Sequence, residues 1–153
     1  MSVLFVLVTT LARRGYALTD QVSESMPKGF YLVYPAQKIT MGEVVVFHPP
    51  KFAADFLVSH HWLPNNHWMM KHVVATPGDF VCNAHDTLTV NHHAIAPLQQ
   101  FDSHGERLPV HHFCRTLQPH QYLMVSTRVK NSYDGRYFGP VEREQIKGRA
   151  LKL

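Results

Sequence analysis

Short apolar runs interrupted by proline, glycine and asparagine make up most of this chain. Several are rich in β-branched and aromatic residues and end at turn-forming residues, as at 30–34, 42–48 and 122–125. This composition favours strands, because branched and aromatic side chains pack well on a pleated surface. Further runs of this kind lie at 73–74, 80–82, 87–90, 94–95 and 146–151. Only 51–58 suggests a helix, so the pattern predicts a mainly β fold of short antiparallel strands with few short helices.

The first apolar run differs from the others because it is long and lies at the N-terminus. Residues 2–12 are almost wholly apolar, and Arg13 and Arg14 end the run. A membrane-spanning helix needs about 20 apolar residues, so this run is too short to span by itself. Three interpretations stay open: the remainder of an anchor, the apolar region of a signal peptide, or a segment lying on the folded domain. We favour a membrane-proximal or partial anchor segment over 1–18, followed by a single domain over 19–153.

The bulk composition narrows the class of protein. The chain has 153 residues, of which 45% are hydrophobic and 17% charged, as expected for one globular domain. Its net charge is +4 and its pI is near 9.2, which permits contact with anionic lipid or nucleic acid. The basic residues are scattered and no Lys/Arg-rich run occurs, so we expect no nucleic-acid partner.

Cysteine and histidine bear on redox state and metal binding. The two cysteines, Cys82 and Cys114, fit either one disulfide in an oxidising compartment or two buried thiols. The 12 histidines include three adjacent pairs, at 60–61, 92–93 and 111–112. Imidazole can bind zinc, copper or nickel, but neighbouring residues of a strand face opposite sides and no His-Glu-x-x-His motif is present. Surface histidines are the favoured interpretation, and we expect no metal and no other cofactor.

Three blocks carry the candidate chemistry. The first is Ser25-Met26-Pro27-Lys28-Gly29, which would form a turn whatever the serine does. The second places a lone lysine, Lys71, in an apolar run that ends at the Pro-Gly-Asp turn 77–79. The third, 131–140, is dense in polar and aromatic residues. A serine needs a neighbouring base to become a nucleophile, and a lysine serves only when neutral, which burial favours. The sequence around Lys71 is apolar, but because strand neighbours alternate faces it does not establish burial.

Taken in this order, the blocks resemble the serine–lysine signal peptidases, and most closely the branch that serves conjugative transfer, the TraF-type peptidases. Residues 25–31 resemble the Ser-x-Pro-x-Gly-x-Tyr segment of that branch. Residues 105–109 and 114–117 are similar to its Gly-Arg-Pro-Leu-Pro and Cys-Arg-x-Leu segments, with Glu106 and Arg107 differing. The lead-in 126–130 departs from the Gly-Asp-Asn-Arg of the bacterial housekeeping branch. The resemblance covers nearly the whole chain.

The resemblance implies a role for individual residues. Ser25 would be the nucleophile and Lys71 the general base. The Ser23 hydroxyl, with the backbone N–H of Ser25, would form the oxyanion hole, and Ser132 would orient the lysine. Preorganised donors of this kind are often the largest catalytic contribution. The resemblance also implies a structural ion pair near the site and a disulfide, formed by Asp134 with Arg136 and by Cys82 with Cys114.

The implied fold is the signal-peptidase-like β fold, and the implied activity is endoproteolysis. The enzyme would cleave the leader or propeptide of an exported protein, with a conjugative pilin precursor as the expected substrate. The substrate would bind as an extended strand, and its acyl group would pass to water or to an amine of the same pilin, producing a cyclic product. We expect the inner membrane as location, with the catalytic domain on the periplasmic side, and lipid and other conjugation proteins as partners. The alternative is a catalytically inactive β-rich accessory module of a secretion apparatus.

Overall fold

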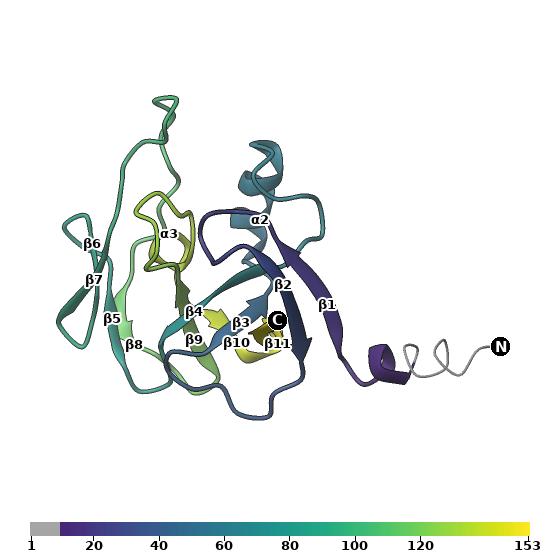
Figure 1. Ribbon diagram of the computed structural model, residues 1–153. Helices are drawn as coiled ribbons and strands as arrows, with labels where there is room; N and C mark the ends of the chain where they lie inside the picture. The colour runs from purple at the N-terminus through teal and green to yellow at the C-terminus, as the bar shows by residue number, and fades with distance from the viewer. Residues whose placement is uncertain (1–9) are drawn as a thin grey trace.

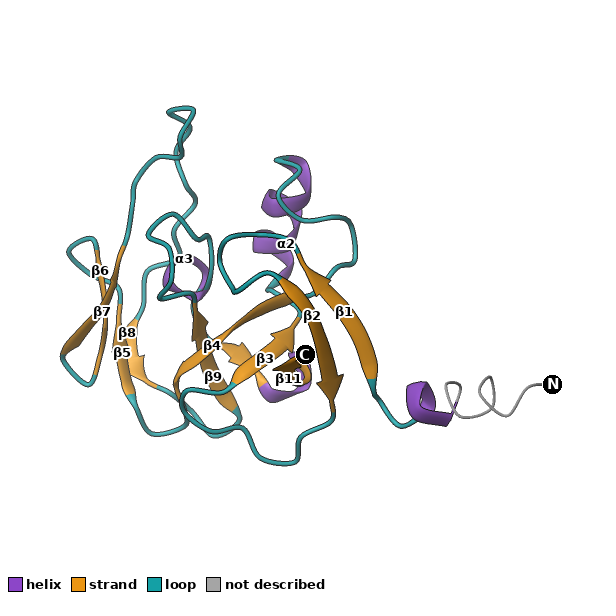
Figure 2. Ribbon diagram, in the orientation of Figure 1, coloured by secondary structure: helices purple, strands orange, loops and turns teal. Residues whose placement is uncertain are grey.

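The computed structural model describes residues 10–153, and within them the fold is mainly β, as predicted (Figures 1 and 2). A seven-stranded sheet and a four-stranded sheet contain all the named strands, and every pairing is antiparallel. From one edge to the other, the large sheet contains β1 (Ala17–Gln21), β2 (Gly29–Tyr34), β11 (Ile146–Lys152), β3 (Val44–Phe47), β4 (Met69–Ala75), β9 (Gln121–Val125) and β10 (Val141–Glu142). The small sheet contains β7 (His93–Pro97), β6 (Thr87–Val90), β5 (Phe80–Cys82) and β8 (Cys114–Thr116).

The N-terminal segment is only partly described. Residues 1–9 of the expected membrane-proximal segment lie outside the described residues, and β1 begins at Ala17, before the expected start of the domain. Within residues 10–153, no helix is both long enough and apolar enough to cross a membrane. The described helices are short: α2 (Lys51–Ser59), α3 (Gly135–Phe138) and the 3₁₀ turn η1 (Arg143–Gln145). The helix predicted over 51–58 corresponds to α2.

The central strands of the large sheet are buried on both faces. Val45 and Met69 pack into the larger core, which also contains Leu57 of α2. Val46 and Met70 pack into a second, smaller cluster with Met26, which lies in the turn between β1 and β2. Because strand neighbours point to opposite faces, this double burial explains why β3 is a continuous apolar run rather than an alternating one.

The small sheet is braced internally by a disulfide and linked to the rest of the chain by side-chain hydrogen bonds. Cys82 and Cys114 lie directly opposite each other in β5 and β8, and the disulfide between them is present. The side chain of Asn83, which is buried, donates to the carbonyl oxygens of His111 and Arg136, both at 3.0 Å. These bonds connect the end of β5 to α3 and therefore to the centre of the molecule.

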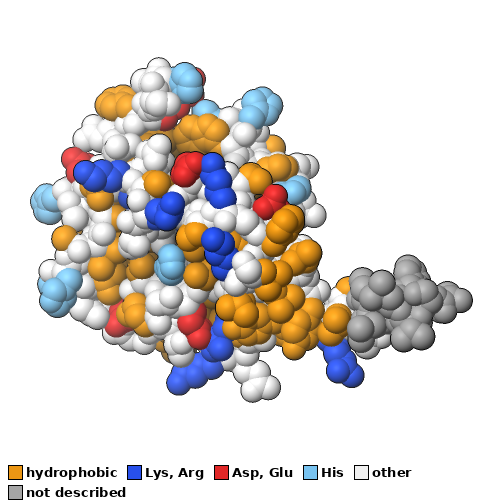
Figure 3. All heavy atoms as spheres, viewed as in Figure 1, with side chains coloured by type: hydrophobic (Ala, Val, Ile, Leu, Met, Phe, Trp, Pro, Cys, Tyr) orange, Lys and Arg blue, Asp and Glu red, His pale blue; other side chains and the backbone are white. Residues whose placement is uncertain are grey.

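One outer face of the large sheet is apolar and exposed. Leu18, Leu32 and Leu151 lie opposite one another across β1, β2 and β11, so their side chains share a face. Phe30 and Leu153, each two residues along, extend the row, and apart from Leu32 each of these side chains is more than half exposed. Figure 3 shows hydrophobic side chains gathered over this part of the molecule. We call these five residues the apolar sheet face.

Candidate active site

Ser25 lies in the turn between β1 and β2, where side chains rather than strand pairing fix the backbone. Gln21 is the last residue of β1 and pairs with Gly29, the first of β2. In the described chain, no strand pairing includes residues 22–28. Two anchors hold the turn instead: Met26 is 1% exposed in the smaller core cluster, and the Tyr31 hydroxyl donates to Pro27 O at 2.7 Å.

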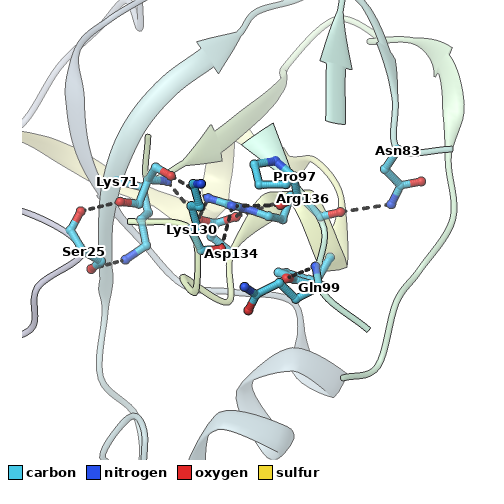
Figure 4. A network of polar contacts seen from close by, with 10 residues as sticks. Ser25, Lys71, Asn83, Pro97, Gln99, Lys130, Asp134 and Arg136 are labelled. Carbon is cyan, nitrogen blue, oxygen red and sulfur yellow. Dashed lines mark hydrogen bonds and ion pairs between the residues drawn. The ribbon is translucent and has the colours of Figure 1, made fainter. Parts of the chain in front are cut away.

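Lys71 approaches this turn from the middle of β4. Its side chain is buried, and its Nζ donates to Ser25 Oγ at 2.8 Å (Figure 4). Burial lowers the pKa of Lys71 to about 8, with the Arg136 charge acting in the same direction and the Asp134 charge opposing it. At pH 7, about one molecule in ten therefore holds Lys71 as a neutral amine that can accept a proton from Ser25. The neighbouring strands supply the burial that the local sequence left undetermined.

Ser23 lies beside the serine that it was expected to assist. Its Oγ is 2.9 Å from Ser25 Oγ, and Gln21 Nε2 donates to the same Ser23 oxygen at 2.7 Å. The Gln21 amide therefore fixes the Ser23 hydroxyl next to Ser25. Sequence reasoning missed Gln21, because a glutamine at the end of a short strand carries no distinctive pattern.

Ser132 is buried and borders the same cavity as Ser25 and Lys71. Among residues 10–153, no hydrogen bond joins its side chain to Lys71. The structure therefore places Ser132 at the site, while its expected role in orienting the lysine stays a prediction.

Asp134 and Arg136 form a fully buried ion pair behind Lys71 (Figure 4). Arg136 Nε donates to Asp134 Oδ1 at 2.9 Å and Arg136 Nη2 to Asp134 Oδ2 at 3.1 Å, a two-point contact that fixes both groups. The remaining Arg136 donors reach carbonyl oxygens of Pro97, Lys130 and Ser126. This pair organises the loop between β9 and α3, which borders the site.

A cavity of about 530 Å³ opens over Ser25 and Lys71. One wall comes from the end of β1 and the turn that follows it, and a second from the segment after α2, including Trp62 and Trp68. Val46, Leu57 and Met70 contribute apolar surface. A cavity that is largely apolar with a few converging polar groups has the character of a ligand-binding site.

Of the histidines, His67 borders this cavity, while His60 and His48 make contacts elsewhere. His60 lies at the end of α2, with its Nε2 2.8 Å from Glu106 Oε2, and the hydrogen bond with Glu106 raises the pKa of His60. His48 stacks on Trp68 with ring centroids 3.5 Å apart. In the part of the chain that the structure describes, no three His, Cys, Asp or Glu side chains are grouped so that they could hold a metal ion.

In this mainly β chain, a buried lysine is hydrogen-bonded to a serine that borders an open cavity. The chain belongs to the signal peptidase family, peptidase S26, which matches residues 1–152, and it is thus a member of a peptidase family. The family that the motifs resemble is confirmed.

Relatives and solved structures were also found. Two proteins of Escherichia coli, each named Plasmid transfer protein TraF, are 33% and 31% identical to this chain over 150 and 148 residues. The alignments cover 90% and 89% of this chain and 83% of each relative. Among solved structures, a signal peptidase I from Enterococcus faecalis matches with a TM-score of 0.44 and 19% identity, over 74% of this chain and 97% of that one.

Proposed function

We propose that this chain is a membrane-associated serine endopeptidase of conjugative transfer, with Ser25 as nucleophile and Lys71 as general base. The observation that carries the proposal is the 2.8 Å hydrogen bond from the buried Lys71 Nζ to Ser25 Oγ, inside a cavity that is open to a substrate. Burial that brings the pKa of Lys71 to about 8 gives the lysine a usable neutral form near physiological pH.

The catalytic cycle follows from this geometry. Ser25 Oγ attacks the scissile carbonyl carbon while neutral Lys71 Nζ takes the hydroxyl proton. The Ser25 N–H and the Ser23 hydroxyl stabilise the oxyanion, and the lysine then returns the proton to the leaving amine. An acyl-enzyme remains on Ser25. Lys71 next takes a proton from the incoming water or amine as it attacks the acyl carbon, and returns that proton to Ser25 Oγ as the ester bond breaks, which restores the serine hydroxyl and the neutral lysine.

The substrate in this proposal is an exported pre-protein, with a pilin precursor as the specific candidate. The support is the family of the chain and its two relatives named Plasmid transfer protein TraF. β1 is an edge strand of the large sheet and leads directly to Ser25, so an extended substrate can add beside it by strand pairing. Transfer of the acyl group to water gives a linear product, and transfer to an amine of the same chain gives a cyclic one.

The proposed location is the periplasmic side of the inner membrane. The apolar sheet face presents Leu18, Phe30 and Leu151 to the outside, and an apolar surface of this kind is suited to lipid contact. The disulfide between Cys82 and Cys114 supports an oxidising compartment. The burial of Lys71 against Ser25 favours an active enzyme over an inactive accessory module, because burying an unused ammonium group is costly.

Processing of a cognate pilin precursor in cells tests this proposal. Ser25→Ala and Lys71→Ala should each leave the precursor uncleaved while the protein accumulates at its normal level. Ser103→Ala and Lys51→Ala are matched controls, because both residues are exposed and lie outside the cavity. Equal cleavage by wild type and by Ser25→Ala would eliminate the enzyme proposal.

A further inference from the structure

Ser126 makes a contact with the nucleophilic turn that the expected site did not include. Its hydroxyl donates to the carbonyl oxygen of Ser25 at 2.5 Å, across 101 positions of sequence. Ser126 is 0% exposed and directly follows β9. We propose that Ser126 is a positioning residue: it holds the backbone of Ser25 so that the serine hydroxyl faces Lys71.

The turn that carries Ser25 needs such a support. In the described chain, residues 22–28 lie outside every strand pairing, so strand pairing does not fix the conformation of Ser25. The anchors at Met26 and Pro27 follow the serine. The bond from Ser126 acts on Ser25 itself, because it fixes the peptide plane that joins Ser25 to Met26.

Ser126 is itself held in place by two hydrogen bonds of its backbone. Its backbone N–H donates to Asp134 Oδ2 at 2.9 Å, and its carbonyl oxygen accepts from Arg136 Nη2 at 2.5 Å. The buried ion pair therefore holds the main chain of Ser126 on both sides, and the Ser126 hydroxyl extends from this group to the turn. This arrangement assigns a purpose to the Asp134–Arg136 pair: it is the fixed base from which the Ser25 carbonyl is held.

Loss of the Ser126 hydroxyl should lower kcat by a measurable factor. A displacement of about 1 Å between reacting groups can cost about a hundredfold in rate, so a nucleophile on an otherwise unpaired turn is sensitive to one lost bond. Replacing Ser126 by alanine removes the hydroxyl and leaves the backbone contacts to Asp134 and Arg136 in place. We expect kcat to fall between about tenfold and a hundredfold, with KM unchanged, because the cavity residues that bind the substrate are untouched.

The test rests on the proposed function and uses the full chain in detergent, with a purified pilin precursor and an N-acyl-dialanyl p-nitrophenyl ester as substrates. The variants are Ser126→Ala, Ser126→Thr and Ser25→Ala, with Thr127→Ala as the matched control, since Thr127 is the exposed neighbour with a hydroxyl of the same kind. Thermal unfolding of each variant is recorded, and rates are measured at a temperature at which all are folded.

Three results together would support the proposal. Ser126→Ala should lose kcat at constant KM, and Ser126→Thr, which keeps the hydroxyl, should recover it. Thr127→Ala should keep wild-type rates. An unchanged kcat in Ser126→Ala would overturn it, as would a lower melting temperature with normal kcat, which would mark a structural role only. If Ser25→Ala matches wild type on both substrates, the proposed function fails, and the positioning role fails with it. Wild-type activity that needs Ser25 but not the Ser126 hydroxyl refutes the positioning role alone.

Discussion

The burial of Lys71 should be measurable as a pH-dependent difference in stability. Its pKa is about 8 in the folded chain and 10.5 ordinarily, so between these values the unfolded state binds more protons than the folded state. The free energy of unfolding of the wild type should therefore rise with pH across this window. Lys71→Met keeps the apolar stem and removes the titrating group, so its stability lacks this contribution. Integrating the linkage relation with these two pKa values gives a gain for wild type over Lys71→Met of about 2–3 kcal/mol between pH 7 and pH 10.

Urea unfolding of the two proteins at pH 7, 8, 9 and 10, with the disulfide intact, measures this gain. The comparison cancels the other titrating groups, which both proteins share. Lys51→Met is the matched control: it removes an exposed ammonium group, so its difference from wild type should change by less than about 0.5 kcal/mol over the same range. If the difference between wild type and Lys71→Met stays constant from pH 7 to pH 10, Lys71 does not have a lowered pKa and the reasoning about its neutral form is wrong.

Three further outcomes are expected. The rate of precursor cleavage should increase from pH 6 to pH 9 with an apparent pKa near 8, because neutral Lys71 is the active form; a flat pH–rate profile would contradict this. Asp134→Asn leaves the buried Arg136 charge without its carboxylate, so it should lower the free energy of unfolding, measured by urea titration, by about 3–5 kcal/mol. A loss below about 1 kcal/mol would mean that the ion pair is dispensable for stability. Thiol titration of the denatured, unreduced protein should find no free thiol, and two free thiols would refute the disulfide. The double variant Cys82→Ser, Cys114→Ser opens a loop of sequence separation 32 and should lower the free energy of unfolding by about 3–4 kcal/mol.

The sequence was most informative where local pattern and function coincide. Runs of branched and aromatic residues located β2, β3 and β9, because each of these strands packs at least one face against a core. The serine turn and the lone lysine could be named from their blocks. Burial of Lys71 could not be predicted, because it depends on what neighbouring strands place above and below β4.

The contacts that sequence reasoning missed are long-range bonds between side chains and the main chain. Ser126 reaches the Ser25 carbonyl from the far end of β9, and nothing in the local sequence of either residue marks the pairing. The strand β8 is three exposed residues long and owes its existence to pairing with β5, so it has no apolar pattern to detect. Gln21 is informative only once the turn has placed Ser23 beside it.

The role of Ser25 as nucleophile can be tested by trapping its acyl-enzyme. Wild-type protein is mixed with the pilin precursor, quenched in acid within seconds and digested, and the peptide that contains Ser25 is examined by mass spectrometry. The proposed mechanism predicts an ester between Ser25 Oγ and the carboxyl end of the N-terminal cleavage fragment, present in wild type and absent in Ser25→Ala. Cleavage by wild type without any adduct on Ser25, together with cleavage at the same rate by Ser25→Ala, would contradict it.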